Sequence, residues 1–117
     1  MFFKKLGSKI ATSVLMSRSG SIVASLTGVS PRELPGPVYE KLSEFIAGIE
    51  QDVLAGHQDP LNDHEGAFLQ LFFIERVLEG NEHGSFTVER FRNARTRLFS
   101  DHKDKIRGDI SFLPFTT

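Results

Sequence analysis

Side chains that could bind a metal gather in one short stretch of the chain. Imidazole and carboxylate groups are the ligands that divalent metals take from proteins. The spacing fits no ligand pattern: there is no His-x-x-x-His pair, and a calcium loop with Gly66 in sixth place would have Leu61 first and Phe72 twelfth, where a carboxylate is needed. We therefore interpret the stretch as an interhelix loop whose acids cap the next helix, with a metal-dependent enzyme as a second alternative. The weak candidate ligands are His57, Asp59, Asp63, His64 and Glu65.

Four arginines lie close together near the end of the chain, a pattern that could indicate a nucleic-acid face. On a helical wheel Arg90 and Arg97 flank one side of an apolar stripe, Arg92 flanks the other, and Arg95 lies within the stripe. They do not form one row that could follow a phosphate backbone. We expect no nucleic-acid partner. Arg95 should either pair with a core carboxylate such as Glu75 or serve at a protein interface, where arginine is enriched.

Motifs for nucleophilic or nucleotide chemistry are missing from the sequence. No serine lies in a Gly-x-Ser-x-Gly elbow, and no phosphate loop or dinucleotide fingerprint occurs. The chain has no cysteine, which excludes disulfides, thiolate metal sites and cysteine nucleophiles. His102 lies on the apolar side of its helix, where a buried histidine with one hydrogen bond is the simplest reading. We therefore predict no catalytic residue and no cofactor.

The composition is that of one small globular domain with an unusual aromatic content. Hydrophobic residues make up 39% of the 117 residues and charged residues 25%, which is ordinary for a globular protein. Eleven aromatic residues are Phe and none is Trp, so burial rather than polar recognition dominates their use. The sequence has no run of eighteen apolar residues, which is the length needed to span a bilayer as a helix. The lack of cysteine fits a reducing compartment, and we expect a cytoplasmic protein that could associate with a membrane.

The charges divide the chain into two parts. Residues 1–35 hold five basic and one acidic side chain, a net charge of +4, whereas residues 36–117 hold nine basic and fourteen acidic ones, a net charge of −5. We interpret residues 1–35 as a basic, Ser-rich amphipathic arm and residues 36–117 as a helical bundle domain. Ser17–Ser21 should break the arm, and Ile22–Leu26 could be a short strand or a helical turn.

Apolar side chains at the start of the arm recur with the period of an amphipathic helix. Such a helix could pack on its own core or on a partner. It could also lie on a membrane surface with its lysines on anionic headgroups, and organellar targeting sequences have the same composition. The residues expected to contact a membrane or a partner are Phe2, Phe3, Leu6, Ile10 and Val14.

Three main helices are predicted in the body, over residues 37–55, about 63–79 and about 88–106. Asn62 or Asp63 can cap the second and Thr87 the third. Nine of the twelve residues from 67 to 78 are apolar. A helix that is apolar on nearly every side must be covered on nearly every side, so it is either the central helix of the bundle or is buried against another chain.

These observations predict an all-α protein: a small helical bundle with three main helices, an N-terminal amphipathic arm and a docked C-terminal tail. We expect a non-catalytic protein that binds a protein partner or itself, as a homodimer or a subunit of a larger assembly. The alternative is a peripheral membrane protein that binds through its N-terminal helix. The residues expected at the interface are Phe68, Phe72, Phe73, Arg95, Phe112 and Phe115.

Overall fold

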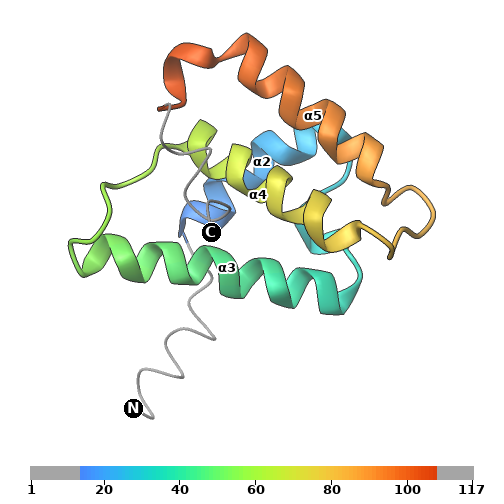
Figure 1. The fold of residues 1–117 in the computed structure, drawn as a ribbon, viewed down its shortest axis with the longest axis horizontal. Helices are drawn as coiled ribbons and strands as arrows, with labels where there is room; N and C mark the ends of the chain where they lie inside the picture. The colour runs from blue at the N-terminus through green and yellow to red at the C-terminus, as the bar shows by residue number, and fades with distance from the viewer. Residues whose placement is uncertain (1–13, 108–117) are drawn as a thin grey trace.

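The computed structural model describes residues 14–107. The tail and several expected contact residues lie outside this range: Phe2, Phe3, Leu6, Ile10, Phe112 and Phe115. Within it the predicted all-α architecture is confirmed (Figure 1). The described chain forms four α-helices and two 3₁₀ helices: α2 (Val14–Thr27), η1 (Pro31–Glu33), α3 (Gly36–Leu54), α4 (Asp63–Leu78), α5 (Val88–Asp101) and η2 (Lys103–Lys105).

Helix α4 is the central helix of the bundle. It contacts α2, α3 and α5, and Figure 1 shows it running between α3 and α5. Leu69, Leu71 and Ile74 are completely buried on it, and Phe68 is only 3% exposed. Of the two alternatives for this apolar helix, the first is therefore confirmed: its own chain covers it. Phe68, which we expected at an interface, is a core residue within one chain.

Helix α2 differs from the sequence prediction. It continues without interruption through Ser17–Ser21, where we expected a break, and through Ile22–Leu26. The physical reason is close packing on α4: a Cβ atom on Gly66 would lie 2.2 Å from Ser19 Oγ, so small side chains are what this contact requires. Burial against α4 outweighs the low helix propensity of serine and glycine.

The part of the predicted arm that the structure describes lies in the same core as the body. Val23 is completely buried, and Met16 and Leu34 are 4% and 5% exposed. All three belong to the cluster that holds the apolar side chains of α3, α4 and α5. Residues 14–35 are therefore packed together with the later helices.

The helix starts were predicted well, and one helix end was not. Asn62 and Thr87 cap α4 and α5 as expected, Asn62 within a full capping box. We predicted that the last helix runs to about residue 106, but α5 ends at Asp101, because His102 takes a non-helical backbone conformation with φ −131°. The chain continues as η2, and Ile106 still reaches the core, with 4% of its surface exposed.

Candidate functional site

The predicted metal-binding stretch does not bring its side chains to one point. Asp63 pairs with Arg18 at 3.0 Å, and His57 is exposed in the loop after α3. His64 instead lies against His102, with ring centroids 4.4 Å apart. Among residues 14–107, no three His, Asp or Glu side chains are arranged to hold a metal ion. We therefore do not take the metal-dependent enzyme forward.

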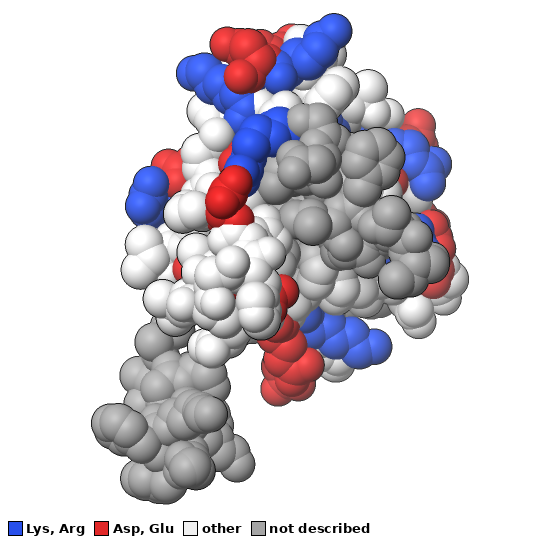
Figure 2. All heavy atoms as spheres, turned by 60° about the vertical axis from the view of Figure 1, so that its left-hand side comes forward, with Lys and Arg blue, Asp and Glu red and all other residues white. Residues whose placement is uncertain are grey.

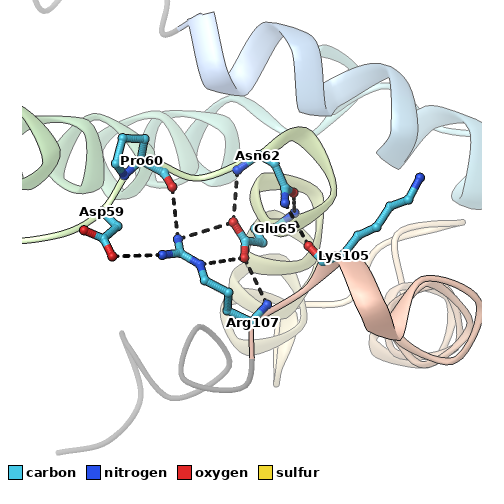
Figure 3. A network of polar contacts seen from close by, with 6 residues as sticks. All are labelled: Asp59, Pro60, Asn62, Glu65, Lys105 and Arg107. Atoms are coloured by element: carbon cyan, nitrogen blue, oxygen red, sulfur yellow. Dashed lines mark hydrogen bonds and ion pairs between the residues drawn. The ribbon is translucent and has the colours of Figure 1, made fainter.

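Glu65 and Asp59, the other two candidates, belong to a polar network that fastens the end of the described chain to the start of α4 (Figure 3). Glu65 is 2% exposed and accepts hydrogen bonds from Arg107 Nε at 2.9 Å and from the backbone N–H of Arg107 at 3.0 Å. Arg107 also donates to Asp59 at 3.3 Å and to the carbonyl of Pro60 at 3.0 Å. We call these four residues the Arg107 clamp.

The helix cap of α4 is built into the same network. The Glu65 carboxylate accepts the backbone N–H of Asn62 at 3.0 Å, while the Asn62 side chain accepts the N–H of Glu65 at 2.8 Å. The Asn62 amide also donates to the carbonyl of Lys105 at 2.8 Å, so the cap reaches across to η2 (Figure 3). One asparagine therefore starts a helix and holds a segment 43 residues away.

The electrostatics of Glu65 are those of a structural carboxylate. Burial by itself would raise the pKa of Glu65, but hydrogen bonds from Arg107 and Asn62, with the positive charge of Arg107, lower the pKa below its ordinary value of 4.5. The group is therefore ionised at neutral pH, and its oxygens are occupied by protein donors. It is poorly suited to accept a proton from a substrate.

A second buried glutamate joins the middle of α4 to α5. Glu75 is 3% exposed and accepts hydrogen bonds from Arg92 Nε at 3.1 Å and Arg95 Nη2 at 3.2 Å. The Arg95 guanidinium also lies over the Phe72 ring, 4.6 Å from its centroid. The prediction that Arg95 pairs with Glu75 is confirmed.

The remaining arginines of α5 are also bound within the chain. Arg90 donates to the carbonyls of Thr27 at 2.8 Å and Ser85 at 3.1 Å, which ties the end of α2 to the turn before α5. Arg97 lies 3.8 Å from Asp101, one turn further along the helix. Arg90, Arg92 and Arg95 therefore join parts of the fold, whereas the pair of Arg97 and Asp101 is exposed and contributes little to stability.

Large apolar side chains are exposed at three described positions: Val14 is 62% exposed, Leu54 81% and Phe99 37%. Val14 begins α2 and Leu54 ends α3, and a hydrogen bond of 3.1 Å from the backbone N–H of Leu15 to Glu50 joins the start of α2 to α3 four residues before Leu54. We call Val14 and Leu54 the exposed apolar pair. Phe73, by contrast, stacks on Phe45 with centroids 4.4 Å apart.

Charged side chains of both signs are mixed on one face of the molecule. On the face shown in Figure 2, lysine and arginine side chains lie beside aspartate and glutamate side chains. The charges on this face therefore largely compensate one another locally. No described helix is long and apolar enough to cross a membrane.

An open groove of about 370 Å³ lies between the start of α3 and the end of α4. Such a volume would suit a small ligand. None of the lining residues is an Asp or Glu, so the groove holds no pair of carboxylate and base. The groove is lined by Pro35, Pro37, Val38, Lys41, Val77, Asn81 and His83.

The sequence did not predict two contacts that organise this region: that of Arg107 with Glu65 and that of His102 with His64. Arg107 and His102 act on α4 residues about forty positions earlier in the chain, and no local pattern announces such contacts. Comparisons of the chain with protein-family models, with curated proteins and with solved structures find no match.

Proposed function

We propose that this protein is a non-catalytic assembly protein that associates with a second copy of itself through the end of the molecule that carries the exposed apolar pair. The observation that carries the proposal is the exposure of Val14 and Leu54, at 62% and 81%, on two helices that are joined by the hydrogen bond from Leu15 to Glu50. The apolar surface of α4 does not support the proposal, because the chain's own helices cover α4.

Val14 links this surface to the N-terminal apolar stripe predicted from the sequence. It is the last member of that stripe and the one that the structure describes. Packing of the stripe on the chain's own core would be expected to bury Val14. Its exposure instead favours a contact with another molecule.

The free energy gained by burying the exposed apolar pair shows that further residues must contribute to the interface. Burying one valine or leucine side chain contributes about 1.5–3 kcal/mol, while a stable interface covers about 800 Å² on each partner. The exposed apolar pair alone is too small. The proposal therefore includes Phe3, Leu6 and Ile10 as further contacts, by virtue of their place in the sequence stripe.

The distribution of charge supports a second copy as the partner. Residues 1–35 carry a net charge of +4 and residues 36–117 a net charge of −5. In a two-fold pairing the same patch serves both subunits, so the basic segment of each copy can lie against the acidic part of the other. Charge complementarity of this kind favours correct encounter and register.

Sedimentation velocity of the full chain tests the proposal. We expect a dimer that dissociates on dilution in the wild type and a folded monomer in Leu54→Glu, because a carboxylate cannot be buried in an apolar contact without a large penalty. Thr96→Glu is the matched control, since it adds the same charge at an exposed position of α5. A wild-type monomer at every concentration, or a dimer in Leu54→Glu, would overturn the proposal.

The same exposure of Val14 favours a second candidate function, binding to an anionic membrane surface. The stripe carries Lys4, Lys5 and Lys9 on its polar side, and basic amphipathic helices bind anionic lipid in this way. Flotation with phosphatidylserine vesicles distinguishes the two. Recovery of the wild type with the vesicles, reduced in Val14→Glu and by added salt, supports the membrane function; no recovery removes it.

A further inference from the structure

Two histidines from distant parts of the chain are in ring contact where α5 meets α4. His64 is the second residue of α4, and His102 follows the last residue of α5. Their ring centroids are 4.4 Å apart with an interplanar angle of 46°. Both side chains are half-buried. We call them the histidine pair.

The pair lies at the point where the chain turns from α5 into η2. The backbone N–H of His102 still bonds to the carbonyl of Leu98 at 2.9 Å, but its φ of −131° breaks the helix. The carbonyl of His102 then accepts the N–H of Lys105 at 2.8 Å, which closes η2. A change in the position of this ring therefore acts directly on the turn.

Charged groups on three elements surround the pair. Asp63 on α4 is paired with Arg18 of α2 at 3.0 Å and offers a negative charge close to His64. From the η2 side, Asp104 offers a negative and Lys105 a positive charge close to His64. The start of α4 also carries the positive end of the helix dipole, which disfavours a cation on His64.

These surroundings make protonation of His64 costly in the folded state. Burial, then the neighbouring His102 and Lys105, lower the pKa of His64 below its ordinary value of 6.5, against the opposite effect of Asp63 and Asp104. Since the pKa is lower in the folded segment than in a released one, the contact is fully stable above pH 6.5. It weakens as the pH falls from that value through the pKa of the folded state.

We propose that the histidine pair is an acid-sensitive contact: when both rings carry a proton they repel each other, the Asn62–Lys105 hydrogen bond breaks, and the turn at His102 and η2 loosen from the start of α4. The Arg107 clamp lies just beyond, and its Glu65 carboxylate, whose pKa lies below the ordinary value, keeps its charge and its bond to Arg107 under mildly acidic conditions. It holds the far end of the segment to α4 while η2 loosens. The turn at His102 and η2 thus move as a hinge, while the Arg107 clamp stays in place, and both parts lie within the described residues.

Amide hydrogen exchange on the full chain, at about pH 7.5 and about pH 5.5, tests this directly, because histidine changes charge in that interval. The readouts are the protection factors of the Lys105 and Ile106 amides, with amides in the middle of α3 as an internal reference. In the wild type we expect the protection of both amides to fall on acidification. The fall should be up to about tenfold for each pH unit by which the pKa of His64 lies below its ordinary value. The α3 amides should keep theirs.

Three variants separate the charge of His64 from its shape. His64→Gln stays neutral and should keep η2 protected at both pH values. His64→Lys is charged at both and should show the loosened state throughout, whereas His57→Lys, on an exposed loop residue, should behave as the wild type. His102→Gln removes the partner ring and should reduce the pH dependence, leaving the part that the burial of His64 and the charge of Lys105 cause.

The proposal is overturned if protection at Lys105 and Ile106 does not change with pH in the wild type. It is equally overturned if His64→Gln shows the same loss on acidification as the wild type. Should His64→Lys fail to fold, His64→Gln and His102→Gln alone still decide the matter.

Discussion

Two buried glutamates of the same helix, Glu65 and Glu75, are held in different ways. Both are nearly inaccessible, at 2% and 3% exposure, and both face arginine side chains. Glu65 also accepts two backbone N–H groups, from Asn62 and Arg107. The hydrogen bonds found for Glu75 come from the guanidinium groups of Arg92 and Arg95 on α5.

The difference shows how a buried charge can serve either the backbone or the packing of side chains. At Glu65 the carboxylate satisfies amide groups at a helix start and at the end of η2, groups that would otherwise lose hydrogen bonds. At Glu75 it neutralises two cations beside an aromatic cluster and accepts their hydrogen bonds, so its contribution depends mainly on its charge. Matched substitutions of the two glutamates should therefore lower the free energy of unfolding by different amounts.

Glu75→Gln should have the larger effect, because it leaves Arg95 near the core without a negative partner. We expect the free energy of unfolding to fall by about 3–5 kcal/mol, as for loss of one member of a buried ion pair. Urea unfolding followed by circular dichroism measures it. Glu44→Gln, on the exposed face of α3, is the control and should stay within about 0.5 kcal/mol of the wild type. A loss at Glu75 no larger than at Glu44 would contradict this view of the ion pair.

Glu65→Gln should cost less, about 1.5–3 kcal/mol near pH 7, the range for hydrogen bonds to a charged group. Its amide oxygen can still accept the N–H of Asn62 or Arg107. Because the pKa of Glu65 lies below 4.5 in the folded state, the stabilisation by its charge is complete above pH 4.5 and is lost as the pH falls through the folded pKa. The difference between wild type and variant should thus shrink with acidification in urea titrations. A difference that stays constant down to about pH 2 would show that charge does not hold Glu65.

Gly66→Ala should have the smallest effect of the three, and it separates the packing at the start of α4 from the Arg107 clamp beside it. The new Cβ would lie 2.2 Å from Ser19 Oγ and 2.8 Å from Leu15 Cδ1, a clash that forces α2 outward. Overpacking costs about 1–3 kcal/mol, partly offset by up to about 1 kcal/mol from the better helix propensity of alanine. The midpoint of thermal unfolding should fall.

Gly48→Ala is the matched control for that change. Gly48 lies on the exposed side of α3 with nothing within 4 Å of a new Cβ, so the same substitution should raise stability by about 0.5–1 kcal/mol. Opposite signs at the two glycines would establish close α2–α4 contact. The same sign at both would refute it.

How far the sequence predicts this molecule depends on how local each feature is. Helix α4 and its Asn62 cap follow from periodicity and capping within a few residues, and the pairing of Arg95 with Glu75 follows from a charge inside an apolar stripe. Helix α2 was missed because its serines and glycine predict a break until Gly66 is placed opposite Ser19.

The contacts of Arg107 and His102 could not be predicted, because they form only when the chain returns to the start of α4. Arg107 is 42 residues from Glu65, and nothing near either residue specifies the other. The candidate metal ligands were misleading for the same reason. Their partners, including Arg18 and His102, come from other helices and use the groups that a metal would need.

The concentration dependence of unfolding in Leu54→Glu tests most directly that the chain covers α4 by itself and meets other molecules elsewhere. We predict one cooperative urea transition whose midpoint stays the same over a wide range of protein concentration, with helix content equal to that of the wild type. A midpoint that rises with concentration, or a variant that is unfolded without urea, would show that α4 needs a second chain to cover it.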